Sequence, residues 1–283
     1  MKQLLAALCA VCWCLAWSTA ALAEKSAVDA ASPKEAATST SATNIRLTTT
    51  DILCPTVNDE ARQDYNSALA AKLKGDLKEA ERLYRLAVAR DERYCDAMDN
   101  LGQLLRMRGR MDEAISWYER SLAVKPDNAV AHQNLAVVYD LQGEAEKAQA
   151  QYQWIIRHDP TNPEGYYGAG LSLLNAGSTD TAIVNLALAE KYYREQKSPL
   201  VEDARYLLGV AHFRKNDYAK ARDYLLPLYE QKRDDPNLNY LLGLCYLDPA
   251  KGDRKRAREL ILKARDLGQT IDPAILLKIE KPD

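Results

Sequence analysis

The chain has 283 residues and a formal net charge of -2 at pH 7. A nearly neutral chain has no basic field to attract polyanions, so its composition argues against a nucleic-acid-binding protein. Phe213 is the sole phenylalanine, whereas tyrosine occurs 16 times, and we therefore expect tyrosine to fill the aromatic packing positions.

The first 23 residues have the pattern of a secretory signal peptide. One cation, Lys2, precedes an apolar run through Trp17, and Ala21-Leu22-Ala23 supplies a cleavage site before Glu24. We predict a signal peptide over residues 1–23, a periplasmic or secreted mature protein, and no stable membrane insertion after cleavage. The alternative is an uncleaved anchor, because the apolar run approaches the ~20 residues that span a bilayer.

Residues 24–51 consist largely of Ala, Ser and Thr and nearly lack large apolar side chains. Such a segment cannot bury enough surface to offset the entropy that it would lose on ordering. We predict a flexible linker over residues 24–51, followed by a folded domain over residues 52–283.

Residues 95–128 have the pattern of a helical hairpin. Met98 and Leu105 share one helical face, Gly109 marks a turn, and Pro126 ends a second amphipathic helix. Two features recur at intervals of 34 residues. The turn glycines are Gly75, Gly109, Gly143 and Gly177, and the small residues of the second helix are Ala80, Ala114, Ala148 and Ala182.

This unit resembles the tetratricopeptide repeat. The family's positions are filled here by Met98, Leu101, Gly102, Leu105, Gly109, Ala114, Tyr118, Ser121 and Pro126. The resemblance implies an all-α fold, namely a right-handed α-solenoid of about six helical hairpins with a C-terminal capping helix. The expected repeats are residues 61–94, 95–128, 129–162, 163–199, 202–235 and 236–268, and the expected cap is residues 270–281.

Two departures from the regular pattern occur in the rear half. The second helix of the fourth repeat can continue to Gln196, which predicts a structural seam before the fifth repeat. The fifth repeat has Asn216-Asp217 where the turn glycine is expected. Asp272-Pro273 then begins the short helix that we expect to cover the sixth repeat.

Three cysteines remain after the predicted cleavage, and an odd count in an oxidising compartment favours one pair and one spare thiol. Cys245 lies at a small-residue packing position and is the expected spare. Cys54 precedes the first hairpin and Cys95 begins the second, so the chain can fold back and join them. The alternative is that both remain free thiols.

The sequence contains no arrangement that predicts catalysis. His132, His158 and His212 lie in different repeats without a metal-ligand spacing, and His132 occupies an aromatic packing position. Phosphate loops and nucleophile elbows are absent. We therefore predict a protein that is not an enzyme and has no catalytic residue, cofactor or metal.

The resemblance implies that the first helix of each hairpin lines a concave peptide-binding groove. The candidate groove residues are Tyr65, Asn66, Asn100, Gln103, Asn134, Tyr167, Leu171, Tyr206, Phe213, Tyr240 and Leu244. The positions are polar in repeats one to three, where they also include Lys72, Asp96, Asp99, Arg106, Gln133 and Asp140, and apolar in repeats four to six. This contrast predicts either a bipartite groove or burial of the apolar part against the cap.

Asn66, Asn100 and Asn134 occupy the same position in three successive repeats. A carboxamide both donates and accepts, so each can pair with the backbone of a bound segment. The row is similar to the asparagine ladder in the repeat domain of O-GlcNAc transferase. The alternative is that asparagine is merely common at this position. Of the five positions of the family's clamp for chaperone tails, only Asn100 matches, so a chaperone tail is not the expected ligand.

These patterns lead to three hypotheses, all with a protein or peptide partner and without nucleic acid. The first is an exported scaffold or adaptor that binds extended segments of partners in envelope or secretion complex assembly. The second is a self-assembling structural subunit, hence a homo-oligomer. The third is a non-catalytic accessory of an exported enzyme system.

Overall fold

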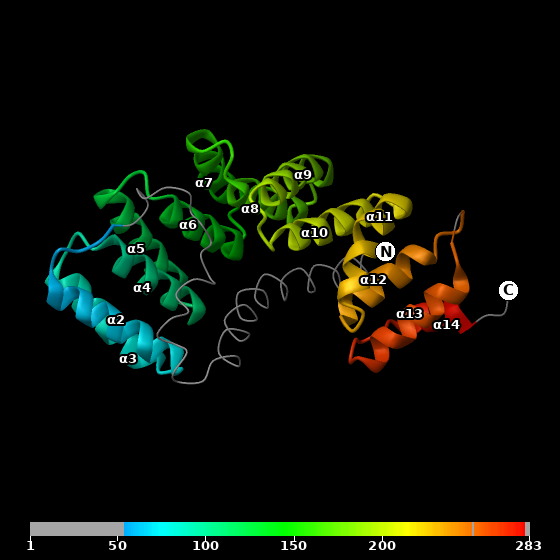
Figure 1. Cartoon of the computed structure of the whole chain (residues 1–283), viewed down its shortest axis with the longest axis horizontal. Coiled ribbons are helices and arrows are strands. Elements are labelled where there is room, and N and C mark those ends of the chain that lie inside the picture. The colour runs from blue at the N-terminus through cyan, green and yellow to red at the C-terminus, as the bar shows by residue number, and fades with distance from the viewer. Residues whose placement is uncertain (1–53, 251, 281–283) are drawn as a thin grey trace. The chain divides into compact units, whose positions relative to one another are not determined.

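The computed structural model describes residues 54–250 and 252–280, and the regular structure in these ranges is entirely α-helical. The predicted signal peptide and linker lie outside them. The helices (Figure 1) are α2 (Asp59–Leu73), α3 (Leu77–Arg90), α4 (Cys95–Met107), α5 (Met111–Val124), α6 (Ala129–Gln142), α7 (Ala145–His158), α8 (Pro163–Asn175), α9 (Thr179–Glu195), α10 (Val201–Arg214), α11 (Tyr218–Gln231), α12 (Pro236–Tyr246), α13 (Arg254–Asp266) and α14 (Pro273–Glu280). None of these helices has the length and apolar character of a membrane span.

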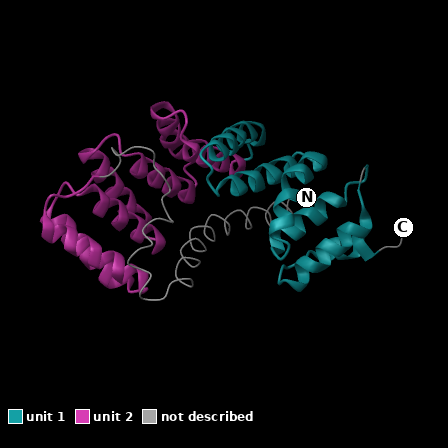
Figure 2. Ribbon diagram, viewed as in Figure 1, with its two compact units in different colours: residues 1–45, 177–283 teal, residues 46–176 magenta. Residues whose placement is uncertain are grey.

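The described residues fall into an N-terminal unit that ends at Ala176 and a C-terminal unit that begins at Gly177 (Figure 2). In the N-terminal unit, α2 packs on α3, α4 on α5, and α6 on α7, and α8 follows. In the C-terminal unit, α9 packs on α10, α10 on α11, α12 on α13, and α13 on α14. The structure thereby confirms an all-α solenoid fold built from consecutive helical hairpins with a short C-terminal helix.

The two units divide within the fourth predicted repeat, one helix before the seam that we expected. Helix α9 nevertheless has the extra length that the sequence predicts, with 17 residues against 14 in each of the preceding second helices α3, α5 and α7.

The turns between paired helices require a left-handed backbone conformation. The φ angle is 79° at Gly75, 74° at Gly109 and 79° at Gly143, a region that glycine enters without a steric cost. In the fifth repeat Asn216 takes this place with a φ of 59°. Asparagine tolerates this conformation better than most residues, so the turn survives the loss of glycine.

Short polar side chains begin many of the helices. The side chain of Asn58 accepts a hydrogen bond from the backbone N–H of Ala61 at the start of α2, and Asn128 accepts one from Ala131 at the start of α6. In the C-terminal unit, Asp235 caps α12 in the same way. Each cap satisfies a backbone donor that the helix itself leaves unpaired.

Close helix packing in the hairpins depends on glycine. A Cβ atom added to Gly102 in α4 would lie 2.6 Å from the ring of Tyr118 in α5, and Tyr118 is fully buried. Gly168 in α8 has the same relation to the ring of Tyr152 in α7, at 2.1 Å. The glycines therefore let large aromatic rings lie directly on a neighbouring helix.

The C-terminal helix covers apolar side chains of the sixth repeat. Ile275 and Ile279 of α14 are buried in one cluster with Ile261 and Leu244, and Phe213 packs against its edge. Leu244 is 6% exposed, so its prediction as a groove residue is wrong. Two interpretations of the apolar rear half were possible, an exposed groove or burial against the cap. For Leu244 the structure shows burial against the cap.

Candidate functional site

The candidate site is the surface formed by α2, α4, α6 and α8 in the N-terminal unit, which we call the first-helix face. It contains the predicted residues Tyr65, Asn66, Asn100, Gln103, Asn134, Tyr167 and Leu171, of which Asn66 is exposed and the others are half-buried. Tyr206, Phe213 and Tyr240 are half-buried in the C-terminal unit. The predicted groove set is thus divided between two units.

Hydrogen bonds between side chains connect consecutive helices across this face. The Nζ of Lys72 in α2 donates to the Oε1 of Gln103 in α4 at 2.7 Å. The Nε2 of Gln133 in α6 donates to the Oε2 of Glu164 in α8 at 3.1 Å. These bonds hold long side chains in defined positions before any partner binds.

A half-buried carboxylate makes a further connection between helices. The hydroxyl of Ser172 in α8 donates to Asp140 in α6 at 2.6 Å, and the hydroxyl of Tyr152 in α7 donates to the same carboxylate at 3.1 Å. Burial raises the pKa of Asp140, although both hydrogen bonds favour its charged form. Asp140 therefore connects three helices, and its carboxylate is already hydrogen-bonded within the protein.

The three equivalent asparagines do not present the same groups. The Nδ2 of Asn100 donates to the hydroxyl of Tyr65 at 3.0 Å and to the backbone carbonyl of Asp96 at 2.9 Å, which leaves only its carbonyl oxygen for a partner. Asn66 lies on the exposed side of α2 beside Arg62. Asn66 differs from Asn100 because no described hairpin precedes α2 to supply a neighbour such as Tyr65.

Tyr65 is fixed in an aromatic cluster at the start of the first-helix face. Its ring centroid lies 5.8 Å from that of Tyr84 and 5.1 Å from that of Tyr94. Burial is the main cause of its raised pKa, and the neighbouring Asp96 adds to it. The hydroxyl of Tyr65 therefore remains a neutral hydrogen-bonding group that accepts from Asn100.

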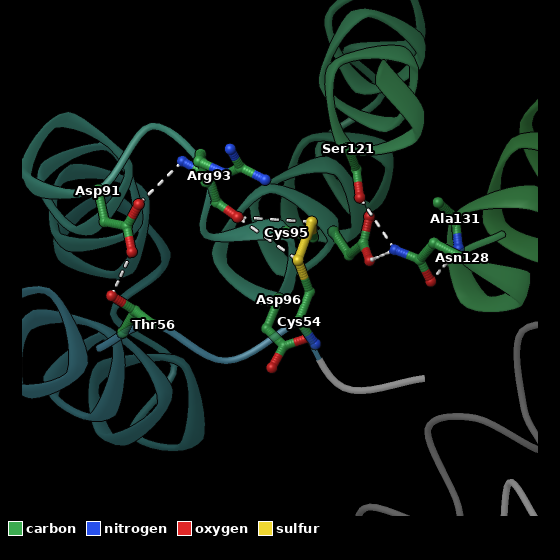
Figure 3. Close-up of a disulfide and its surroundings, with 10 residues drawn as sticks. Cys54, Thr56, Asp91, Arg93, Cys95, Asp96, Ser121, Asn128 and Ala131 are labelled. Atoms are coloured by element: carbon green, nitrogen blue, oxygen red, sulfur yellow. Dashed lines mark hydrogen bonds between the residues drawn. A yellow bond between two sulfur atoms is a disulfide. The ribbon is translucent and has the colours of Figure 1, made fainter. Parts of the chain in front are cut away.

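Asp99 in α4 is only 5% exposed. Its Oδ2 accepts a hydrogen bond from the Nδ2 of Asn128 at 2.7 Å, and Asn128 also donates to the hydroxyl of Ser121 (Figure 3). Its Oδ1 is buried without a partner among the described residues. Burial raises the pKa of Asp99 to about 6, although hydrogen bonds from Asn128 and Ser121 oppose the shift.

The disulfide region lies beside the first-helix face. Cys54 and Cys95 are joined by a disulfide with a Cα separation of 5.2 Å (Figure 3). The backbone N–H of Cys54 donates to Asp96 at 3.2 Å, and the hydroxyl of Thr56 donates to Asp91. The segment before α2 is thus attached to the start of α4, while Cys245 is a buried free thiol.

The described residues contain no group of three His, Cys, Asp or Glu side chains that could hold a metal ion. His132 packs as predicted: it is 8% exposed, and its ring stacks on that of Trp154 with centroids 3.7 Å apart. The chemistry of the first-helix face is hydrogen bonding and apolar contact.

Comparisons with known proteins agree with this architecture. Two family models, both described as tetratricopeptide repeat, match residues 59–127 and 94–160 and residues 134–193 and 186–236. The structure of the anaphase-promoting complex hetero-tetramer Cut9-Hcn1 has a TM-score of 0.67 at 17% identity, covering 79% of this chain and 43% of that chain. At such low identity this likeness shows the fold alone.

Two similar proteins are subunits of larger complexes. Anaphase-promoting complex subunit CDC16 of Saccharomyces cerevisiae is 32% identical over 131 residues, which is 45% of this chain and 15% of that protein. BBSome complex member BBS4 of Bos taurus is 27% identical over 153 residues, which is 52% of this chain and 27% of that protein. The chain thus matches only a small part of their length. From the repeat matches over residues 59–236, the chain belongs to the tetratricopeptide repeat family.

Proposed function

We propose that this protein is an exported scaffold or adaptor whose first-helix face binds an extended segment of a protein partner during assembly of an envelope or secretion complex. Tetratricopeptide repeats generally form protein-interaction scaffolds and are typically non-catalytic. The observation that carries the proposal is the polar first-helix face, where side-chain hydrogen bonds between consecutive helices hold groups that can pair with a peptide backbone.

The relatives support a role within an assembly. CDC16 and BBS4 are both named as members of multi-protein complexes. The export part of the proposal is supported by the sequence of residues 1–23 and by the pairing of Cys54 with Cys95, because structural disulfides persist in oxidising compartments. We propose that this disulfide forms in the exported protein.

The self-assembly hypothesis loses one of the side chains that motivated it. Leu244 is buried beneath α14, and Phe213 and Tyr240 pack against the same cluster. Leu244 is therefore not available to a second copy, and Phe213 and Tyr240 keep only part of their surface exposed. The adaptor hypothesis is therefore the one that we retain.

The test is capture of partners by the mature chain and by an Asn66→Ala, Asn134→Ala double variant, after crosslinking in the source cells. At about 1 kcal/mol for each lost hydrogen bond, the affinity should fall about thirtyfold. Asn185→Ala is the matched control, because Asn185 lies on α9 and its Nδ2 bonds only locally, to the Thr181 carbonyl. Equal partner recovery by the double variant and the control would refute binding at this face.

A further inference from the structure

Three apolar side chains occupy one repeat position at the C-terminal ends of three first helices. Leu73 ends α2, Met107 ends α4, and Leu141 is the penultimate residue of α6, each separated from the next by 34 residues. Leu73 is 74% exposed and Met107 is 43% exposed, while Leu141 is half-buried. We call these three side chains the apolar row. Single exposed apolar residues are ordinary, but recurrence at one repeat position aligns these three along the stack.

The helices that carry the apolar row are neighbours in the N-terminal unit. The bond between Lys72 and Gln103 holds α2 beside α4 close to Leu73, and α4 also contacts α6. Packed helices lie about 8–10 Å apart. A segment in the extended polyproline II conformation advances about 3.1 Å per residue with three residues per turn, so every third side chain lies on the same face. Every third residue of such a segment would therefore meet the next member of the row. The equivalent position in the fourth repeat is Asn175 in α8, a polar residue, so the row has three members.

Positive charge accompanies the first two members of the apolar row. Lys72 and Arg106 directly precede Leu73 and Met107, and Lys74 follows Leu73. Among the described residues, neither Lys74 nor Arg106 forms an ion pair with a carboxylate, and the Nε of Arg106 is buried without a hydrogen-bond partner. A bound segment with carboxylates at this edge would gain favourable electrostatic contacts there.

We propose that the apolar row binds a partner segment of about seven residues in the extended polyproline II conformation, with apolar side chains at every third position and carboxylates between them. This inference rests on the proposed function, because it assigns the partner's chemistry at one edge of the first-helix face. An α-helical partner would instead place one apolar residue per about seven residues against successive members, since a helix rises 1.5 Å per residue.

The test uses fluorescein-labelled synthetic peptides and the mature chain. The probe has leucine at every third position with glutamate between, and two further peptides have the leucines scrambled or lysine in place of glutamate. We expect the probe to bind the mature chain and both others to bind at least about tenfold more weakly, equivalent to about 1.4 kcal/mol. A heptad-spaced peptide tests the helical alternative.

The protein variant for this test is Leu73→Gln, Met107→Gln. Both side chains are exposed, so helicity by circular dichroism should not change, and affinity for the probe should fall about tenfold. The matched control is Leu277→Gln in α14, where the side chain is 63% exposed, and it should bind normally.

Several results would overturn the inference. These are failure of the probe to bind, equal binding by the double variant, no preference for the leucine spacing, tighter binding of the lysine peptide, or tighter binding of the heptad peptide. If partner capture still depends on Asn66 and Asn134 in any of these cases, the proposed function stands and only the assignment to the apolar row fails.

Discussion

Replacing Asp99 with Asn should change how the stability of the N-terminal unit depends on pH. The pKa of Asp99 is raised from its ordinary value of 3.8 to about 6, mainly by burial. The folded unit therefore holds this proton more tightly than the unfolded chain does between pH 4 and 6. This difference in pKa between the folded and unfolded states corresponds to about 3 kcal/mol of stability.

The sign follows from linkage. Because the folded state binds more protons in this window, the contribution of Asp99 to stability is greatest below pH 4 and falls by about 3 kcal/mol as pH rises through 6. Asp99→Asn removes this titration and keeps an oxygen that can accept the hydrogen bond from Asn128. The free energy of unfolding of the variant, relative to the wild type, should thus rise by about 2.5 kcal/mol between pH 4 and pH 7.

Tryptophan fluorescence during urea unfolding measures this difference in the relevant unit. The chain has four tryptophans, and the two that remain after residues 1–23 are removed, Trp117 and Trp154, both lie in the N-terminal unit. Glu146→Gln is the control, because Glu146 is an exposed carboxylate on α7. Parallel pH profiles for Asp99→Asn and the wild type would show that the buried carboxylate does not titrate as argued.

Three further substitutions or deletions test the packing. Gly102→Ala places a Cβ atom 2.6 Å from the ring of Tyr118, so urea unfolding should show a loss of about 1–3 kcal/mol, and Tyr118→Leu in the same chain should recover part of it. Truncation after Gly268 removes α14 and uncovers the apolar cluster of the sixth repeat, so it should lower the thermal midpoint and induce binding of a hydrophobic dye; an unchanged midpoint would argue against a capping role. Cys54→Ser opens a loop with a sequence separation of 41 residues and should cost roughly 4 kcal/mol in the chain-entropy model, whereas a variant that matches the wild type without reductant would mean that Cys54 and Cys95 are not linked in solution.

The helical hairpins could be predicted because local sequence controls them. A turn glycine at Gly75, Gly109 and Gly143 is required by a backbone angle, and this requirement does not depend on distant residues. The fifth repeat shows the same rule with a different residue, since Asn216 adopts the left-handed conformation there. Periodicity therefore located the helices even where the glycine was missing.

The polar contacts of the first-helix face could not be predicted in the same way. Asn128 and Asp99 are separated by 29 positions, and their bond depends on how the turn before α6 packs on α4. A helical periodicity identifies a face but not which residue of the next hairpin it meets. The burial of Leu244 was ambiguous for that reason, because the pattern did not show how far α14 extends over the sixth repeat.

Equivalent repeat positions also acquire different roles from their neighbours. Asn100 and Asn134 have the same place in their hairpins, yet Asn100 is bonded to Tyr65 of the preceding hairpin. In the third hairpin the residue that corresponds to Tyr65 is Asp99, whose Oδ2 accepts a hydrogen bond from Asn128. A ladder of identical residues in the sequence therefore becomes a set of unequal groups in the structure.

This difference between fixed and unfixed side chains affects the conformational entropy that is lost when a partner binds. Immobilising a flexible side chain at an interface costs about 0.5–1.5 kcal/mol, and a side chain that is already fixed does not incur that cost again. Lys72, Gln103 and Asn100 are held by bonds to neighbouring helices, so a partner meets them preorganised. Leu73 and Met107 are not held by hydrogen bonds, and burial of their apolar surface must outweigh their ordering. Truncating a fixed polar group should therefore remove a larger share of affinity per atom than truncating a member of the apolar row.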